Sequence, residues 1–230
     1  CDPHLQIIPG RLKHVIFDHD GTISTLREGW ESVMEPIMVQ SILGPSYDMV
    51  DNGQLKEIQS RVREYIDEST GIQTIVQMED LVEMVREYGL VPREHIQDKF
   101  DYKHRYNEAL MQMVNGRIAR IESGDLEKDD FVMKGVVEFL EELARAGVTL
   151  YLASGTDHED VVQEAEKLGY AKYFQGGIFG ALGDMNKFSK KKLIARIMED
   201  NNLEGKQLMV VGDGPVEIRE CRKRGGIALG

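Results

Sequence analysis

Three short apolar runs, each stopped by a polar turn, restrict the fold of this chain more than any other feature of its sequence. They cover residues 14–17, 148–153 and 208–211, and a glycine lies in the turn that follows each of them. A short, continuous apolar run is typical of a strand buried on both faces, as the strands of parallel sheets are. Segments with helical spacing separate the runs. This alternation predicts an α/β fold built on a doubly wound parallel sheet.

The segment between the first two strands has helical patterns and no strand pattern. Leu81, Met84, Val85 and Tyr88 recur at the spacing of one helix face, and Gly89 then provides a stop. The helices predicted in this segment cover residues 24–43, 54–69, 74–88 and 94–122.

The remaining elements complete the predicted core. They are a helix with the apolar face Val136, Val137, Leu140 and Leu143, a helix over 158–168, a short strand at 178–179, a helix over 190–200 capped by Ser189, a helix that starts with Pro215, and a last strand at 227–229. We therefore predict two domains: an α/β core of residues 1–23 and 125–230, and an inserted all-helical domain of residues 24–124. An insertion after the first strand would lie over the carboxyl ends of the strands, as a cap.

Composition excludes several classes of protein. The formal net charge is -12, whereas a protein that wraps nucleic acid needs clustered Lys and Arg. No segment approaches the ~20 apolar residues of a membrane span. Because the only cysteines are Cys1 and Cys221, we expect no disulfide framework and predict a cytoplasmic location.

Acidic side chains gather where the predicted strands end. Asp18 and Asp20 follow the first strand, and Asp213 follows a later one, with Glu217 four residues further on. Ligands of open α/β sheets bind at these carboxyl ends. Carboxylates that meet there would repel one another unless a cation joined them, and ligands that are all oxygen favour Mg²⁺. The sequence therefore predicts a Mg²⁺ site with a reactive carboxylate.

A turn or a calcium loop is the competing interpretation of Asp18 and Asp20. The pattern Asp-x-Asp-Gly is common in turns, and some calcium loops begin with it. An EF-hand that starts at Asp18 would need a Glu at its twelfth position, where this chain has Gly29. The calcium-loop interpretation is thereby excluded.

Four segments resemble the signatures of the haloacid dehalogenase superfamily, and they occur in the family's order. They are residues 18–22 (Asp-His-Asp-Gly-Thr) after an apolar strand, the apolar strand of residues 150–154 that ends in Ser154, Lys190 near a helix start with Lys187 as a competitor, and residues 212–213 followed by Glu217. A helical insertion after the first strand resembles the branch of phosphoglycolate phosphatases and β-phosphoglucomutases. The resemblance covers the whole predicted core.

The resemblance implies a division of work among the acidic residues. Asp18 would attack phosphorus and form an aspartyl-phosphate, and Asp20 would act as general acid and then as general base. The Asp18 carboxylate, the Asp20 backbone carbonyl and Asp213 would bind Mg²⁺. Glu217 would support the metal from outside its direct ligands.

The resemblance also implies a phosphate site, although local structure could account for the same residues. Ser154 and Gly155 would bind the transferring phosphoryl group, and Lys190 would offset its charge. The Ser154-Gly155 pair could instead cap the following helix. A run of lysines at a helix start is usually a solvated face, and Lys187 and Lys190 both stay open. We expect His19 to pack or to point away rather than to react.

An acid at position 20 restricts the reaction that the resemblance implies. Phosphatases and phosphomutases of the superfamily keep this acid, whereas its dehalogenases and phosphonate hydrolases typically lack it. We predict hydrolysis of a small phosphorylated metabolite, with a phosphomutase and a non-catalytic binding domain as alternatives. Relatives usually carry another helix and strand beyond this point, whereas this sequence stops at Gly230. We therefore expect the strand at 227–229 to lie at an edge of the sheet.

Overall fold

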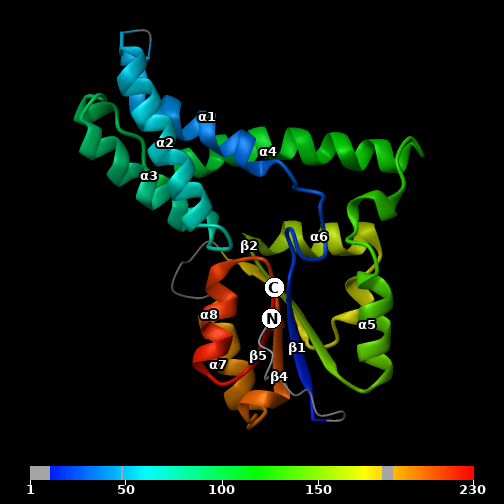
Figure 1. Cartoon of the computed structure of the whole chain (residues 1–230). Helices are drawn as coiled ribbons and strands as arrows, with labels where there is room; N and C mark the ends of the chain where they lie inside the picture. The colour runs from blue at the N-terminus through cyan, green and yellow to red at the C-terminus, as the bar shows by residue number, and fades with distance from the viewer. Residues whose placement is uncertain (1–10, 48, 183–188) are drawn as a thin grey trace. The chain divides into compact units, whose positions relative to one another are not determined.

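A five-stranded parallel sheet is the centre of the fold. Figure 1 shows the computed structural model, which describes residues 11–47, 49–182 and 189–230. Within these residues the strand order is β3-β2-β1-β4-β5. The strands are β1 (His14–Asp18), β2 (Thr149–Asp157), β3 (Gly177–Ala181), β4 (Leu208–Val211) and β5 (Ile227–Leu229). β5 is an edge strand of this sheet, as predicted.

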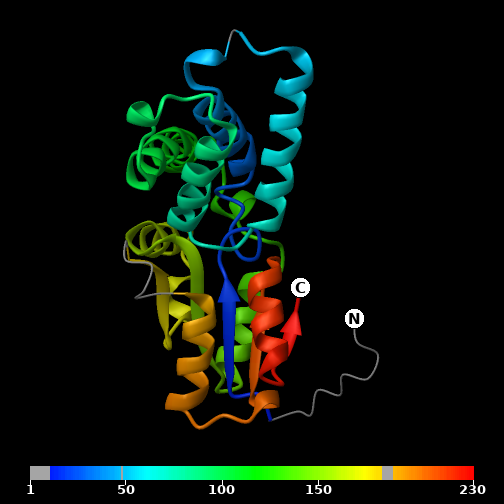
Figure 2. The same cartoon turned by 90° about the vertical axis from the view of Figure 1, so that its left-hand side faces the viewer.

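Helices cover both faces of the sheet (Figures 1 and 2). One face carries α7 (Lys190–Asp200) and α8 (Pro215–Lys223), and the other carries α5 (Val136–Arg145) and α6 (His158–Leu168). Successive side chains of β1 point to opposite faces. Ile16 packs in the core beneath α7 and α8, while the ring of Phe17 meets that of Phe139 on α5, with 6.0 Å between the centroids. The prediction of a doubly wound α/β sheet is therefore confirmed.

A second compact unit, Leu26–Leu126, is all-helical in the residues described. Its α-helices are α1 (Trp30–Leu43), α2 (Asn52–Glu68), α3 (Thr74–Tyr88) and α4 (Lys99–Glu122). Methionines, among them Met34, Met38 and Met78, are fully buried in its core. The other unit holds the residues up to Thr25 and from Glu127 onward, and thus the whole sheet.

Five short 3₁₀ helices connect these elements in the described part of the chain. They are η1 (Gly44–Ser46), η2 (Arg93–His95), η3 (Lys128–Phe131), η4 (Ala171–Tyr173) and η5 (Gly205–Gln207). Among the helices described, none is both long and apolar enough to cross a membrane.

Two helices begin later than the sequence predicted. The helix expected from residue 24 begins at Trp30, because Gly29 has a φ of 87° and breaks the helical backbone before it. Ser24 forms bridges with Asp20 and Val132 instead. The helix expected from residue 94 begins at Lys99, where the Asp98 side chain accepts hydrogen bonds from the first-turn backbone.

β2 is longer than predicted. The sequence indicated a turn after Ala153, whereas the strand continues to Asp157. Pairing with β3 accounts for the difference, because Asp157 still pairs with Ala181 after a register shift. Ser154 and Thr156 both lie in this extension.

Candidate active site

The sheet brings the ends of β1, β2 and β4 together. Asp18, the last residue of β1, pairs with Ala153 of β2, and its neighbour Phe17 pairs with Val211 of β4. Residues that follow these positions therefore meet at one edge. Asp18 itself is only 5% exposed.

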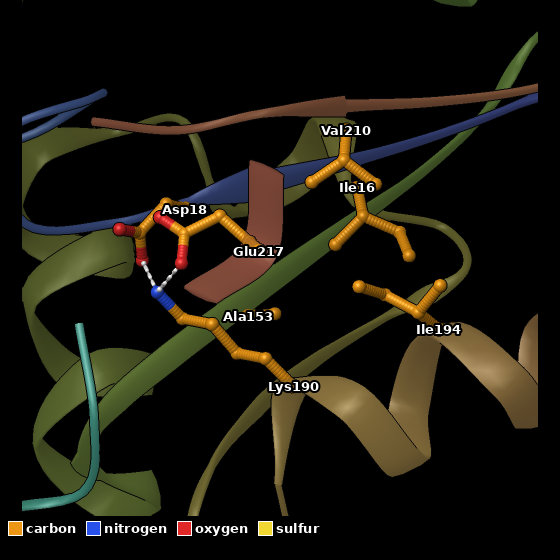
Figure 3. A pocket seen from close by; sticks show the side chains of 7 residues that line it. All are labelled: Ile16, Asp18, Ala153, Lys190, Ile194, Val210 and Glu217. Carbon is orange, nitrogen blue, oxygen red and sulfur yellow. Dashed lines mark hydrogen bonds and ion pairs between the residues drawn. The ribbon is translucent and has the colours of Figure 1, made fainter. Parts of the chain in front are cut away.

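Lys190 forms the electrostatic centre of the site (Figure 3). Its Nζ lies 2.8 Å from Asp18 Oδ1 and 3.2 Å from Glu217 Oε2, and all three side chains are buried. Burial lowers the pKa of Lys190, but the two carboxylates outweigh this effect and raise it above its ordinary value. Lys190 is therefore a buried cation beside Asp18, and not part of a solvated face. Lys187, its competitor in the sequence, lies outside the described residues.

The Asp18 carboxylate is costly to ionise in this environment. Burial raises the pKa of Asp18 to about 6, although Lys190 opposes the shift; Glu217 adds to it. Oδ1 of Asp18 also accepts a hydrogen bond of 2.8 Å from the backbone N–H of His19. The carboxylate is thus held by two donors on one oxygen.

Glu217 connects Lys190 with the loop after β4. Its Oε2 faces Lys190, and its Oε1 accepts a 2.9 Å hydrogen bond from the backbone N–H of Gly214. A Cβ on Gly212 or Gly214 would lie 2.6 or 2.7 Å from Oε1. The loop therefore needs glycine at both positions to let Glu217 approach.

Asp213 completes a group of three carboxylates. It is exposed, and partial burial followed by the charge of Asp18 raises its pKa. Gly21 has a φ of 77°, and a Cβ there would lie 2.2 Å from Asp213 Oδ2. The turn after β1 and the loop after β4 consequently touch.

This carboxylate group fits a divalent cation. Asp18, Asp213 and Glu217 each offer an oxygen, and these oxygens lie within 4.8 Å of one another. Lys190 supplies a single positive charge against them; Glu217 raises the pKa of Asp18, and Asp18 raises the pKa of Asp213. Oxygen donors with excess negative charge suit a hard divalent metal. Glu217 is already engaged by Lys190 and Gly214, which favours a supporting role for it.

Asp20 is held by hydroxyl groups from β2. Its Oδ2 accepts hydrogen bonds from Ser154 Oγ at 3.0 Å and from Thr156 Oγ1 at 2.9 Å. Its Oδ1 lies 3.3 Å from Nδ1 of His19. Thr156 was not predicted as a site residue, because residues 154–157 were interpreted as a turn; the spacing of two between Ser154 and Thr156 would have indicated it.

The predicted phosphate site is assembled only in part. Ser154 is 1% exposed, and its hydroxyl donates to Asp20. Gly155 lies between Ser154 and Thr156 within β2. Lys190 is next to Asp18, as a phosphate ligand would have to be. The binding of phosphate by these residues stays a prediction.

A small pocket adjoins the buried charges. Its walls are Ile16, Ala153, Ile194 and Val210, together with Asp18, Lys190 and Glu217 (Figure 3). Apolar walls keep water and its screening away from one side of the ion pair. The charges of Lys190 and Asp18 therefore act on each other, and on a neighbouring anion, more strongly than at an open surface.

Comparison with protein families gives a match over most of the chain. The model of a family of hydrolases, described as haloacid dehalogenase-like hydrolase, matches residues 12–223. No curated protein gives a significant match to the sequence.

Solved structures share the fold at low sequence identity. β-Phosphoglucomutase from Clostridium difficile aligns with a TM-score of 0.64 and 13% identity, over 95% of this chain and 84% of that one. A predicted phosphoglycolate phosphatase from Haemophilus somnus aligns with a TM-score of 0.58 and 16% identity, over 97% of this chain and 86% of that one. A predicted phosphatase from Clostridium acetobutylicum aligns with a TM-score of 0.56 and 19% identity, over 95% of this chain and 84% of that one. At these identities the likeness establishes the fold.

We expect the stability of the metal-free protein to depend on pH through Asp18. Its pKa of about 6 lies above the ordinary 3.8, so the folded protein takes up a proton where the unfolded chain does not. Relative to Asp18→Asn, the wild type should therefore gain stability as the pH falls from about 8 to about 5, by on the order of 1–3 kcal/mol. Urea unfolding of both proteins in EDTA measures the difference. A difference that does not change with pH would contradict the raised pKa.

Proposed function

The chain belongs to the haloacid dehalogenase-like hydrolases, and from this premise we propose that it is a Mg²⁺-dependent phosphatase that hydrolyses a small phosphorylated metabolite through an aspartyl-phosphate. The observation that carries the proposal is the 2.8 Å contact of Lys190 with Asp18, beside the converging oxygens of Asp213 and Glu217. A cation, a buried carboxylate and a candidate metal site in this arrangement suit attack on a phosphate ester.

Asp18 is the proposed nucleophile. The backbone of His19 and the ammonium of Lys190 both engage its Oδ1, and Oδ2 is the oxygen proposed to form the new bond to phosphorus. As that bond forms, the bond from phosphorus to the leaving oxygen breaks. Lys190 stabilises the negative charge of the transferring phosphoryl group. Mg²⁺, which we assign to the Asp18 carboxylate, the Asp20 backbone carbonyl and Asp213, would supply further charge neutralisation when bound.

Asp20 is the proposed general acid and base. In its protonated form it donates a proton to the leaving oxygen, and as a carboxylate it then accepts a proton from the water that attacks the aspartyl-phosphate. The hydroxyl groups of Ser154 and Thr156 hold its carboxyl group in place between these steps. Water attack restores Asp18 and releases phosphate.

Ser154 and Gly155 are the proposed ligands of the phosphoryl oxygens, together with Lys190. Because the Ser154 hydroxyl donates to Asp20 in this structure, we propose that it exchanges this partner when phosphate binds. The helical unit is the proposed cap, which would exclude water and restrict substrates to small metabolites. A cytoplasmic location remains a prediction from the low cysteine content.

A phosphomutase is the second candidate function. The similarity to a structure of β-phosphoglucomutase favours it, and Asp20 would serve either reaction. The two reactions differ in whether water or a sugar hydroxyl accepts the phosphoryl group from Asp18.

Replacing the nucleophile should abolish phosphate release. Asp18→Asn removes the attacking carboxylate, so hydrolysis of every ester in a panel of small phosphate monoesters should fall by more than about a thousandfold. The assay measures released phosphate with Mg²⁺ and with EDTA, which should also stop the wild type. Isomerisation of a sugar phosphate without phosphate release would favour the phosphomutase. Unchanged activity in Asp18→Asn would contradict both candidate functions.

Two neighbouring lysines provide a matched test of the proposed phosphate site. Lys190→Met removes the buried cation and should lower kcat/KM by about 10²–10³-fold, the usual effect of losing one charge-stabilising group. Lys191→Met removes an exposed lysine from the same turn and should leave kcat/KM within about twofold of the wild type. If Lys187→Met reproduces the loss and Lys190→Met does not, the assignment of Lys190 is wrong.

Metal binding can be measured without catalysis. At saturating Mg²⁺ the melting temperature of the wild type should rise by about 5–10 °C, because a ligand that binds only the folded state stabilises it. Asp213→Asn should abolish the rise, whereas Asp129→Asn, which removes an exposed acid from η3, should retain it. An equal rise in Asp213→Asn would show that Mg²⁺ binds elsewhere.

A further inference from the structure

His19 is buried between the two acidic residues of the turn after β1. It is 0% exposed, and both of its ring nitrogens have polar neighbours. Nε2 lies 2.7 Å from the Tyr170 hydroxyl, and Nδ1 lies 3.3 Å from Asp20 Oδ1. A buried imidazole needs a partner for each of its nitrogens, and here one of these partners is the proposed acid Asp20. His19 was expected to pack or to point away rather than to react; it is buried, and it also contacts the proposed acid.

We propose that His19 is a positioning residue, which donates a hydrogen bond from Nδ1 to Asp20 and so orients this carboxyl group for proton transfer, and that Tyr170 determines which ring nitrogen carries the hydrogen. The inference rests on the proposed function, because it concerns the proposed general acid of that reaction. It adds His19 and Tyr170 to the proposed site, and neither is proposed to contact the substrate.

Tyr170 has the properties of a hydrogen donor to His19. It is 0% exposed, and burial raises the pKa of its hydroxyl far above the ordinary value, so the group keeps its hydrogen. The Ser24 hydroxyl also hydrogen-bonds the Tyr170 oxygen. In the proposed arrangement Ser24 donates to that oxygen and the Tyr170 hydrogen points to Nε2 of His19. A neutral imidazole that accepts at Nε2 carries its own hydrogen on Nδ1, which faces Asp20.

Hydrogen bonds to both carboxyl oxygens of Asp20 contribute to its orientation. His19 engages Oδ1, while Ser154 and Thr156 engage Oδ2. With His19 removed, Oδ1 loses this donor while Oδ2 keeps its two, and the group turns more easily about its Cβ–Cγ bond. The Asp20 side chain is 26% exposed, so solvent competes for the released oxygen. An acid that turns away from the leaving oxygen no longer transfers its proton efficiently.

A metal site is the competing interpretation of this cluster. His19, Asp20 and Glu164 each offer one atom, and these atoms lie within 4.8 Å of one another. A metal bound to His19 would need one ring nitrogen without hydrogen and without another partner. In this structure Tyr170 and Asp20 engage both ring nitrogens of His19, so the hydrogen-bonded interpretation accounts for the histidine without a metal.

Leaving-group dependence separates positioning from a merely structural role. An alkyl phosphate needs a proton on its leaving oxygen, whereas p-nitrophenyl phosphate has a leaving group stable enough to depart without one. His19→Leu should therefore lower kcat/KM for the best alkyl phosphate of the panel by about 10–100-fold, the cost typical of a misplaced catalytic group. The kcat/KM for p-nitrophenyl phosphate should change by less than about threefold. Tyr170→Phe should show the same selectivity with a smaller loss.

Matched variants serve as controls. His19→Asn places an amide N–H near the position of Nδ1 and should recover most of the activity on the alkyl phosphate, whereas His19→Gln should not. Tyr173→Phe removes a hydroxyl that hydrogen-bonds Glu141 instead, and it should leave kcat/KM unchanged for both substrates. Asp20→Asn should itself show the selective loss, because it removes the proposed acid.

Each outcome decides one question. If Asp20→Asn is selective and both His19→Leu and Tyr170→Phe lose activity equally on the two substrates, or lose none, the inference about His19 fails and the proposed function stands. If Asp20→Asn is not selective, the proposed function fails first. Should His19→Leu not fold, the activities of Tyr170→Phe on the two substrates test the inference. Nitrogen NMR of the wild type then shows which ring nitrogen of His19 carries the hydrogen. The signals of His19 are identified by their absence from the spectrum of His19→Asn. A hydrogen found on Nε2 of His19 would overturn the inference.

Discussion

The buried contact of Lys190 with Asp18 and Glu217 is the interaction on which the site depends. It joins the end of β1, the start of α7 and the first turn of α8, which are far apart in the sequence. Losing one partner of such a contact costs about 3–5 kcal/mol, because the remaining charge is left buried. With Asp213 nearby, negative charge still exceeds positive charge. The same arrangement thus connects three parts of the core and leaves a site suited to a divalent cation.

The close approach of two loops gives this charge cluster its geometry. The turn after β1 and the loop after β4 touch where a Cβ on Gly21 would lie 2.2 Å from Asp213. Gly212 and Gly214 leave room for the carboxylate of Glu217 in the same way. These glycines matter because of the space they leave beside acidic side chains, and a larger residue at any of them would move a proposed metal ligand or its support.

Asp20 occupies an environment of a different kind from Asp18. Asp18 is surrounded by charges, whereas Asp20 is surrounded by the hydroxyl groups of Ser154 and Thr156 and by the imidazole of His19. One end of the site therefore suits charge stabilisation and the other suits proton transfer. Two carboxylates of similar intrinsic acidity can take different roles when their surroundings differ in this way.

Local sequence patterns determined the strands at β1 and β4, the cap at Ser189, the start of α8 at Pro215 and the positions of Asp18, Asp20 and Asp213 at strand ends. These features depend on burial preference and on hydrogen bonds between near neighbours, which a sequence shows directly. The extension of β2 to Asp157, the burial of Lys190 from within a run of lysines, and the contacts of His19 with Tyr170 were decided by the tertiary structure. Each depends on residues that are distant in the sequence. β3 pairs with the extension of β2, and two distant carboxylates hold Lys190. The hydroxyl of Tyr170, which follows α6, contacts the ring of His19. Long-range contacts such as these leave no local signal in the sequence.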